Sequence, residues 1–187
     1  MMNWRKALST LTAFLLTAFA IAACSDDVES FAEFSDDCFF AVLSDDDSQP
    51  RGFSSEDIVL RLSNIEAFDP ATGKIKINDA QRINAVAFPL PTQHYIHFFS
   101  NDDYLFSAKL SHAFSSMMVT GLTMTYWMTD QNNASIYEFS TFQIVDDGKV
   151  IEGSRTDQQK SGLKRMQEIL QSTGKVKKVD YPKWEFY

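Results

Sequence analysis

Cysteines are few in this sequence, and the familiar catalytic motifs are missing from it. The chain holds two cysteines, Cys24 and Cys38, and no G-x-S-x-G, P-loop, G-x-G-x-x-G, H-E-x-x-H or C-x-x-C pattern. The adjacent carboxylates at 102–103 and 146–147 fall in expected turns, where a buried pair with separated pKa values seldom forms. We therefore expect a protein that is not an enzyme. A hydrolase of unrecognised type stays open as an alternative.

Basic residues are also in the minority. Lysine and arginine number 17 against 25 aspartates and glutamates, for a formal net charge of −8. This balance disfavours a nucleic-acid partner, because phosphate binding requires a basic face. The charge is unevenly spread: residues 24–69 hold 13 acids and two bases, whereas residues 148–187 hold five acids and nine bases. The basic C-terminal segment either opposes the acidic segment within the fold or faces anionic surface polymers.

The chain has one long apolar run, and it lies at the N-terminus. Arg5 and Lys6 precede the run at residues 7–23, which closes in small residues as a cleaved secretory signal does. A transmembrane helix is the alternative. At 17 residues the run is at the short limit of the roughly 17 to 25 that span a bilayer, and four serines and threonines dilute it. We therefore favour a signal peptide at residues 1–23.

The end of this signal, Ile21-Ala22-Ala23-Cys24, resembles the lipobox of bacterial lipoproteins. The resemblance implies that Cys24 becomes the mature N-terminus and carries acyl chains that anchor the protein to the outer membrane. The following Ser25-Asp26-Asp27-Val28-Glu29 resembles the serine-plus-acidic tether of surface-exported lipoproteins in the Bacteroides group. It implies exposure at the cell surface, although a solvated acidic linker without an address function is the alternative.

The remaining chain is long enough for one domain. Removal of residues 1–23 leaves 164 residues, and aromatics make up 13% of the sequence, so we expect a folded core. We assign residues 24–37 to an acidic tether and residues 38–187 to a single α+β domain. If Cys24 is lipidated, Cys38 is the only thiol left, so no internal disulfide can form, and we expect Cys38 to be buried.

Alternating and β-branched segments predict an antiparallel β-meander of about five to seven strands. Turn signals predict two hairpins, at residues 101–103 and at 146–149. Ser63 and Glu66 match a capping box and predict a short helical turn, and residues 79–91 look like a connection. The candidate strands cover residues 39–43, 58–62, 74–78, 92–100, 104–110, 117–129 and 135–145, with a short final strand at 176–179.

A C-terminal amphipathic helix is expected over residues 156–172, packed on one face of the sheet. Four apolar side chains recur there at helical spacing: Leu163, Met166, Ile169 and Leu170. Gly174 is placed as the glycine that ends the helix.

Two groups of polar residues invite a metal site, and in both cases we favour a plainer role. Residues 45–47 are three aspartates, but the ligand spacing of an EF-hand loop is absent, so we expect a solvated loop. His94 and His97 fall in an expected strand, where this spacing puts them on opposite faces, and His112 has no evident partner. We therefore expect no metal and no cofactor.

Aromatic residues are the strongest sign of a binding surface. Trp127 and Tyr137 lie on neighbouring expected strands, and Trp184 is near the C-terminus. Core packing is the plainer explanation for them. As the alternative, we take these three as possible ligand-facing aromatics, because such side chains suit a sugar ring or a protein partner.

Several short segments are similar to a group of small lipoproteins of gut Bacteroides species. They are residues 63–68, 72–75, 97–106 and 115–116, and the late helix that ends in residues 170–176. No activity and no site residue follow from this likeness. The sequence as a whole predicts a membrane-anchored, surface-exposed module that binds a glycan or an outer-membrane protein. A periplasm-facing structural or assembly lipoprotein is the alternative.

Overall fold

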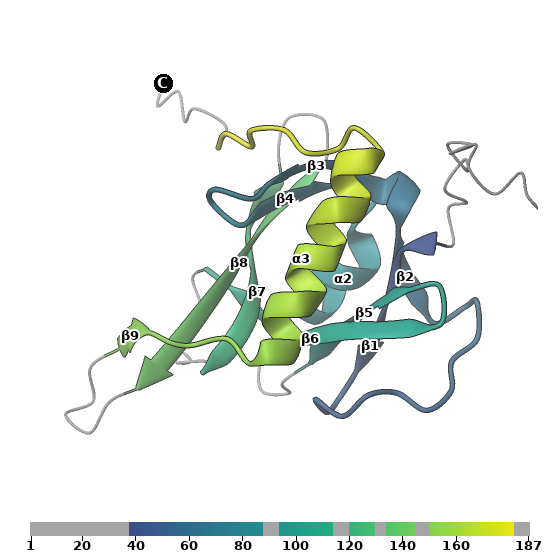
Figure 1. The fold of residues 1–187 in the computed structure, drawn as a ribbon, viewed down its shortest axis with the longest axis horizontal. Coiled ribbons are helices and arrows are strands. Elements are labelled where there is room, and N and C mark those ends of the chain that lie inside the picture. The colour runs from purple at the N-terminus through teal and green to yellow at the C-terminus, as the bar shows by residue number, and fades with distance from the viewer. Residues whose placement is uncertain (1–37, 88–93, 114–119, 130–133, 145–149, 182–187) are drawn as a thin grey trace, which may run out of the picture. The chain divides into compact units, whose positions relative to one another are not determined.

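Nine strands form one open, mostly antiparallel β-sheet, and a C-terminal helix packs against it (Figure 1). The computed structural model describes residues 38–87, 94–113, 120–129, 134–144 and 150–181. The expected signal peptide, Cys24, the tether and Trp184 lie outside these residues. Within the described parts of the chain, no helix is long and apolar enough to cross a membrane.

The sheet confirms the expected α+β class but has more strands than the five to seven predicted. The strands are β1 (Phe40–Ser44), β2 (Ile58–Arg61), β3 (Ile65–Asp69), β4 (Lys74–Ile77), β5 (Tyr95–Ser100), β6 (Asp103–His112), β7 (Gly121–Thr129), β8 (Ser135–Ile144) and β9 (Val150–Glu152). Their order is β2-β1-β5-β6-β7-β8-β4-β3, and β9 pairs with β8.

Three pairings depart from a simple meander. β6 and β7 run parallel, with Lys109 opposite Thr123. β1 pairs with β5, and β4 pairs with β8, although neither pair is consecutive in the sequence. Alternation along a strand shows which side chains share a face, but it does not reveal which strands become neighbours. The predicted hairpin at 101–103 joins the antiparallel neighbours β5 and β6. The predicted turn at 146–149 lies outside the described residues, and β8 and β9 on either side of it pair antiparallel. Asn101 has the positive φ, 52°, that a tight turn requires.

The two outermost strands, β2 and β3, follow each other directly in the sequence. A single 3₁₀ turn, η2 (Leu62–Asn64), joins them, so the open sheet curves far enough to bring both edges to this turn. The capping box expected at Ser63 and Glu66 is therefore wrong. The Arg61 N–H instead donates to Oδ1 of Asn64 at 2.9 Å, and Glu66 lies within β3, because pairing with β4 outweighs the local helical signal.

A short helix, α2 (Gln81–Ala87), occupies part of the segment expected to be a connection. Its Ile83 is fully buried in the core, and Arg82 donates from Nη1 to the carbonyl oxygens of Glu56 and Ile58 at 2.8 and 3.0 Å. Arg82 thus satisfies carbonyl groups at and just before β2, an edge strand.

The long helix α3 (Asp157–Ser172) confirms the sequence prediction almost to the residue. Thr156 caps its first turn, with the Gln159 N–H donating to Thr156 Oγ1 at 3.2 Å, and the Gln159 side chain accepts from the Thr156 N–H. Gly174 has φ of 68° and ends the helix, as expected. The helix lies against β6, where Gly162 sits directly over the Leu105 carbonyl (Figure 1).

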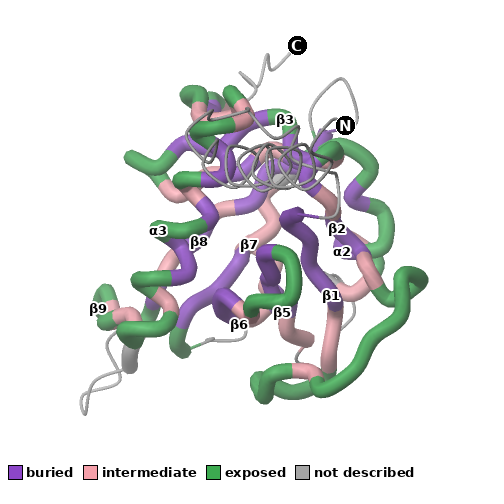
Figure 2. Tube along the Cα trace, turned by 45° about the vertical axis from the view of Figure 1, so that its right-hand side comes forward, coloured by how far each residue is buried: buried purple, intermediate pink, exposed green. Residues whose placement is uncertain are grey.

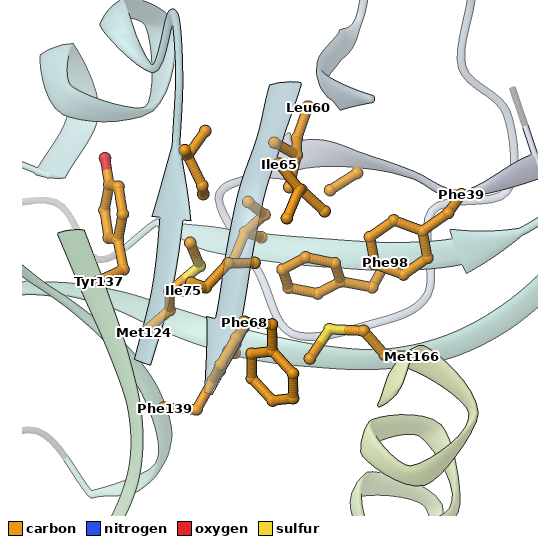
Figure 3. Packing of buried hydrophobic residues seen from close by; sticks show 14 of the residues in the cluster. Phe39, Leu60, Ile65, Phe68, Ile75, Phe98, Met124, Tyr137, Phe139 and Met166 are labelled. Carbon is orange, nitrogen blue, oxygen red and sulfur yellow. The ribbon is translucent and has the colours of Figure 1, made fainter. Parts of the chain in front are cut away.

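The core lies between the sheet and the two helices. The four apolar residues of α3 singled out by their spacing are all buried, and so is Cys38. Figure 3 shows Met166 of α3 pointing toward the cluster that holds Phe98. Phe98 stacks on Phe106 with 4.7 Å between ring centroids. In contrast, the loop between β1 and β2 is exposed along most of its length (Figure 2).

Candidate functional site

The described structure has a groove beside α3. Its walls are α3, the turn between β3 and β4, the middle of β8, and β9 with the segment that follows it, and its volume is about 680 Å³. We call it the α3–β8 groove. Figure 1 shows the β3–β4 hairpin and β9, which contribute to its lining, on the same side of α3.

The groove exists because β8 changes its neighbour along one edge. The first half of β8 pairs with β4, and this contact ends where the Phe139 N–H donates to the Gly73 carbonyl at 2.9 Å. The pairing with β9 begins where the Gly153 N–H donates to the Thr141 carbonyl at 2.9 Å. Between these two points β8 changes its partner, and the residues on either side line the groove together with α3.

The β3–β4 turn forms a rigid wall of the groove. Asp69 accepts from the Ala71 N–H at 3.0 Å, and its backbone carbonyl accepts from the Gly73 N–H at 2.8 Å. Burial raises the pKa of Asp69, but hydrogen bonds from Thr72 and Ala71 to the carboxylate outweigh it and lower the pKa. Gly73 has φ of 72°, and a side chain there would meet the Phe139 carbonyl at 2.7 Å. Only glycine therefore fits at this point.

Three cationic side chains line the groove. Arg155 is half-buried and donates from Nε to Thr141 Oγ1 at 3.3 Å. Lys160 and Lys164 lie one turn apart on α3 and are exposed. Among the described residues, no carboxylate forms an ion pair with Arg155 or Lys164, and Lys160 has only a 3.4 Å contact with exposed Asp157. The groove therefore carries positive charge that the described fold does not neutralise.

Two carboxylates and an apolar rim complete the lining. Glu138 accepts from the Tyr181 hydroxyl at 2.8 Å, and Glu152 is exposed. Phe142 is 39% exposed and Ile151 is 44% exposed, and both line the groove. Large exposed hydrophobic side chains are few among the described residues, so two of them beside one groove favour a binding role.

The aromatic residues selected from the sequence do not form a common binding surface. Tyr137 is fully buried, and its hydroxyl donates to Oδ1 of Asn84 on α2, so its proposed ligand-facing role is wrong. Burial raises the pKa of Tyr137 well above its usual value. Alternation along β8 did not reveal that α2 covers the face that carries Tyr137.

Trp127 lies in a different environment from Tyr137, and Trp184 lies outside the described residues. The pairing of β7 with β8 shifts register at Trp127, which is the extra residue of a β-bulge. Its ring is half-buried and packs on Tyr181, with 5.5 Å between centroids. In the described structure its buried indole N–H has no hydrogen-bond partner. Neither Trp127 nor Tyr137 lines the α3–β8 groove.

The aspartates at 45–47 are exposed, as expected, but two histidines hold their loop in place. His94 Nδ1 lies 2.9 Å from Asp45 Oδ1, and His97 Nε2 lies 3.1 Å from the Asp46 carbonyl. Burial of His97 lowers its pKa, although nearby Asp46 acts in the other direction. In the part of the chain that the structure describes, no three His, Cys, Asp or Glu side chains gather as a metal site.

Three carboxyl groups of the described structure have a pKa below the usual value because of hydrogen bonds, namely Asp46, Asp57 and Asp69, and none of the three lines the groove.

Comparison with family models, curated proteins and solved structures finds no match for this chain. The groove is therefore interpreted from its own residues. The sequence interpretation missed Arg155, Phe142 and Ile151 as site residues. The one available signal was the basic excess of residues 148–187, to which Arg155, Lys160 and Lys164 belong.

Proposed function

We propose that this chain is a lipid-anchored protein of the bacterial outer membrane, exposed at the cell surface, that binds a glycan or a partner protein without catalysing a reaction. The lipobox-like Ile21-Ala22-Ala23-Cys24 and the acidic segment after it support the anchor and the address. The observation that carries the binding role is the α3–β8 groove. Among the described residues, its Arg155 and Lys164 have no carboxylate partner, and its rim exposes Phe142 and Ile151.

The binding role is tested with the full-length protein and a variant that fills the groove. Ala71 is exposed and lines the groove, whereas Ala85 is exposed on α2 and lies outside it. We expect Ala71→Trp to abolish binding on a glycan array or crosslinking to an outer-membrane partner, and Ala85→Trp to leave both intact. If the unmodified protein binds no glycan and crosslinks to no partner, the proposed binding role fails.

The surface location is tested by protease treatment of intact cells. We expect the protein to be digested while a periplasmic marker stays intact. Protection of the chain would favour the periplasm-facing structural or assembly role instead.

A further inference from the structure

Arg155 is positioned to bind a carboxylate supplied by a ligand. Its Nε donates to Thr141 Oγ1 at 3.3 Å, which holds the guanidinium against β8. The two terminal nitrogens make no hydrogen bond with any other described residue. A planar guanidinium held in this way pairs with a carboxylate through two parallel hydrogen bonds, a geometry that a lysine cannot reproduce.

Two lysines extend the positive charge of Arg155 along the groove. Lys160 and Lys164 are spaced four residues apart on α3, so they follow the same wall. Of the two carboxylates in the groove, Glu138 is already engaged with the Tyr181 hydroxyl, and Glu152 is exposed to solvent. Cations therefore outnumber carboxylates by three to two in the lining, and the surplus attracts an anionic ligand.

The form of the groove favours a saccharide over an acidic peptide. A peptide that added itself as a strand would need a long open edge on β8, but β4 and β9 occupy most of that edge. A saccharide needs no backbone ladder. It uses carboxylate acceptors such as Glu152 and an exposed ring, which Phe142 supplies.

We propose that the α3–β8 groove binds an acidic oligosaccharide, with Arg155 pairing with the carboxylate of a uronic acid and Lys160 and Lys164 contacting neighbouring anionic groups. This inference rests on the proposed binding function and names the ligand class of the same site.

The test compares two forms of the same sugar chain. Full-length lipidated protein in detergent is titrated with oligogalacturonate and oligomannuronate and with their methyl esters, which keep the hydroxyl groups but lack the charge. We expect at least one acid form to bind and its methyl ester to bind on the order of tenfold more weakly, because a charge-assisted hydrogen bond is lost. Added salt should weaken the acid form selectively.

Matched variants locate the carboxylate contact. Arg155→Lys keeps the charge but removes the planar fork, and Lys164→Ala removes an exposed charge from the groove. Arg165→Ala is the control, because Arg165 neighbours Lys164 on α3, lies outside the groove and pairs with Glu168 at 3.4 Å. We expect the first two variants to weaken the acid form by about tenfold and the control to leave it unchanged. A thermal melt checks that Arg155→Lys is folded. Because Lys164 is exposed, Lys164→Ala tests the charge contribution of the groove independently of any effect on folding.

Three outcomes would overturn this inference. The first is equal binding of acid and methyl ester, and the second is acid binding that survives both groove variants. The third is competition by poly-glutamate as strong as that by the uronate chain, which would show that the site selects charge without selecting a sugar. If only neutral glycans bind, and Ala71→Trp abolishes that binding, the inference is wrong while the proposed function stands. If the protein binds no glycan and crosslinks to no partner, both this inference and the proposed binding function are wrong.

Discussion

Gly162 lets the C-terminal helix lie directly on the sheet. A Cβ at this position would come within 2.6 Å of the Leu105 carbonyl oxygen and 2.7 Å of the Phe106 ring. The first of these atoms belongs to the backbone of β6 and cannot rotate away. The helix pattern alone marks Gly162 only as a weak helix former, but the packed structure makes it the point of closest contact between α3 and β6.

Gly162→Ala should lower the free energy of unfolding by about 1–3 kcal/mol, because α3 must move away from β6. Chemical denaturation of the full-length protein measures this change. Ser161→Ala is the control on the neighbouring exposed residue and should stay within about 0.5 kcal/mol of the unmodified protein. Equal stability of the two variants would show that the contact at Gly162 relaxes without cost.

His97 is a buried titratable residue that ties β5 to the loop after β1. Its side chain is fully buried, and Nε2 faces the Asp46 carbonyl oxygen at 3.1 Å. Because a carbonyl oxygen only accepts, the neutral ring carries its proton on Nε2. Nδ1 lies 3.4 Å from the Tyr104 hydroxyl. This arrangement satisfies a neutral imidazole, and burial lowers the pKa of His97 accordingly.

The lowered pKa of His97 gives a pH dependence of stability with a definite sign. The unfolded chain takes up a proton at His97 below its ordinary pKa of about 6.5, while the folded chain resists doing so. Stability should therefore fall as the pH drops through 6.5, until the folded pKa is reached. In denaturation curves between about pH 7 and pH 5, His97→Gln should show a shallower pH dependence than the unmodified protein. Identical slopes would count against a neutral His97 in the fold.

At the scale of the element, α3 carries its own start and stop signals. The Thr156–Gln159 capping box starts the helix. At its end, the N–H of Lys175, the residue after Gly174, donates to the Leu170 carbonyl at 2.7 Å. These contacts span a few residues, so the sequence located the helix closely. At residues 63–66 the local pattern favoured a helical turn, but the chain enters β3 at Ile65, where pairing with β4 overrides this signal.

Thr156→Ala should destabilise the protein by about 1 kcal/mol, since an N–H of the first turn of α3 loses its acceptor. Thermal denaturation measures the loss, with Gln158→Ala as the control at an exposed position of the same turn. Thr156→Ser keeps the acceptor and should recover most of the stability. Failure of this recovery would assign the effect to packing of the threonine methyl group.

At the scale of the whole molecule, acidic and basic residues are separated along the chain, and the fold places them in different surroundings. The basic residues at 155, 160 and 164 lie far apart from the acidic segment in the sequence and gather around the α3–β8 groove. The acidic loop at 45–47 interacts instead with His94 and His97 of the neighbouring β5 region. Of the two roles considered for the basic segment, contact with an external anion is the one that the groove supports.

Cys24→Ser should remove the proposed lipid anchor. We expect most of the protein to leave the membrane fraction or to persist as an unprocessed precursor, because acyl chains supply roughly 0.8 kcal/mol per buried methylene. Fractionation of cells and mass spectrometry of the N-terminus measure both results. Cys38→Ser changes a thiol buried in the core and should leave the protein in the membrane fraction. Membrane retention of Cys24→Ser with an unmodified Met1 would favour a transmembrane helix.

The sequence by itself determined the α+β class, the C-terminal helix with Gly174 at its end, the hairpin at 101–103 and the burial of Cys38. Each of these follows from residues a few positions apart or from a simple apolar pattern. The tertiary structure alone decided that β4 lies beside β8, that Tyr137 is covered by α2, and that Arg155 lines a groove. These features depend on contacts between residues far apart in the chain. No local pattern specifies such contacts, because their energies arise only when the whole sheet and both helices are assembled.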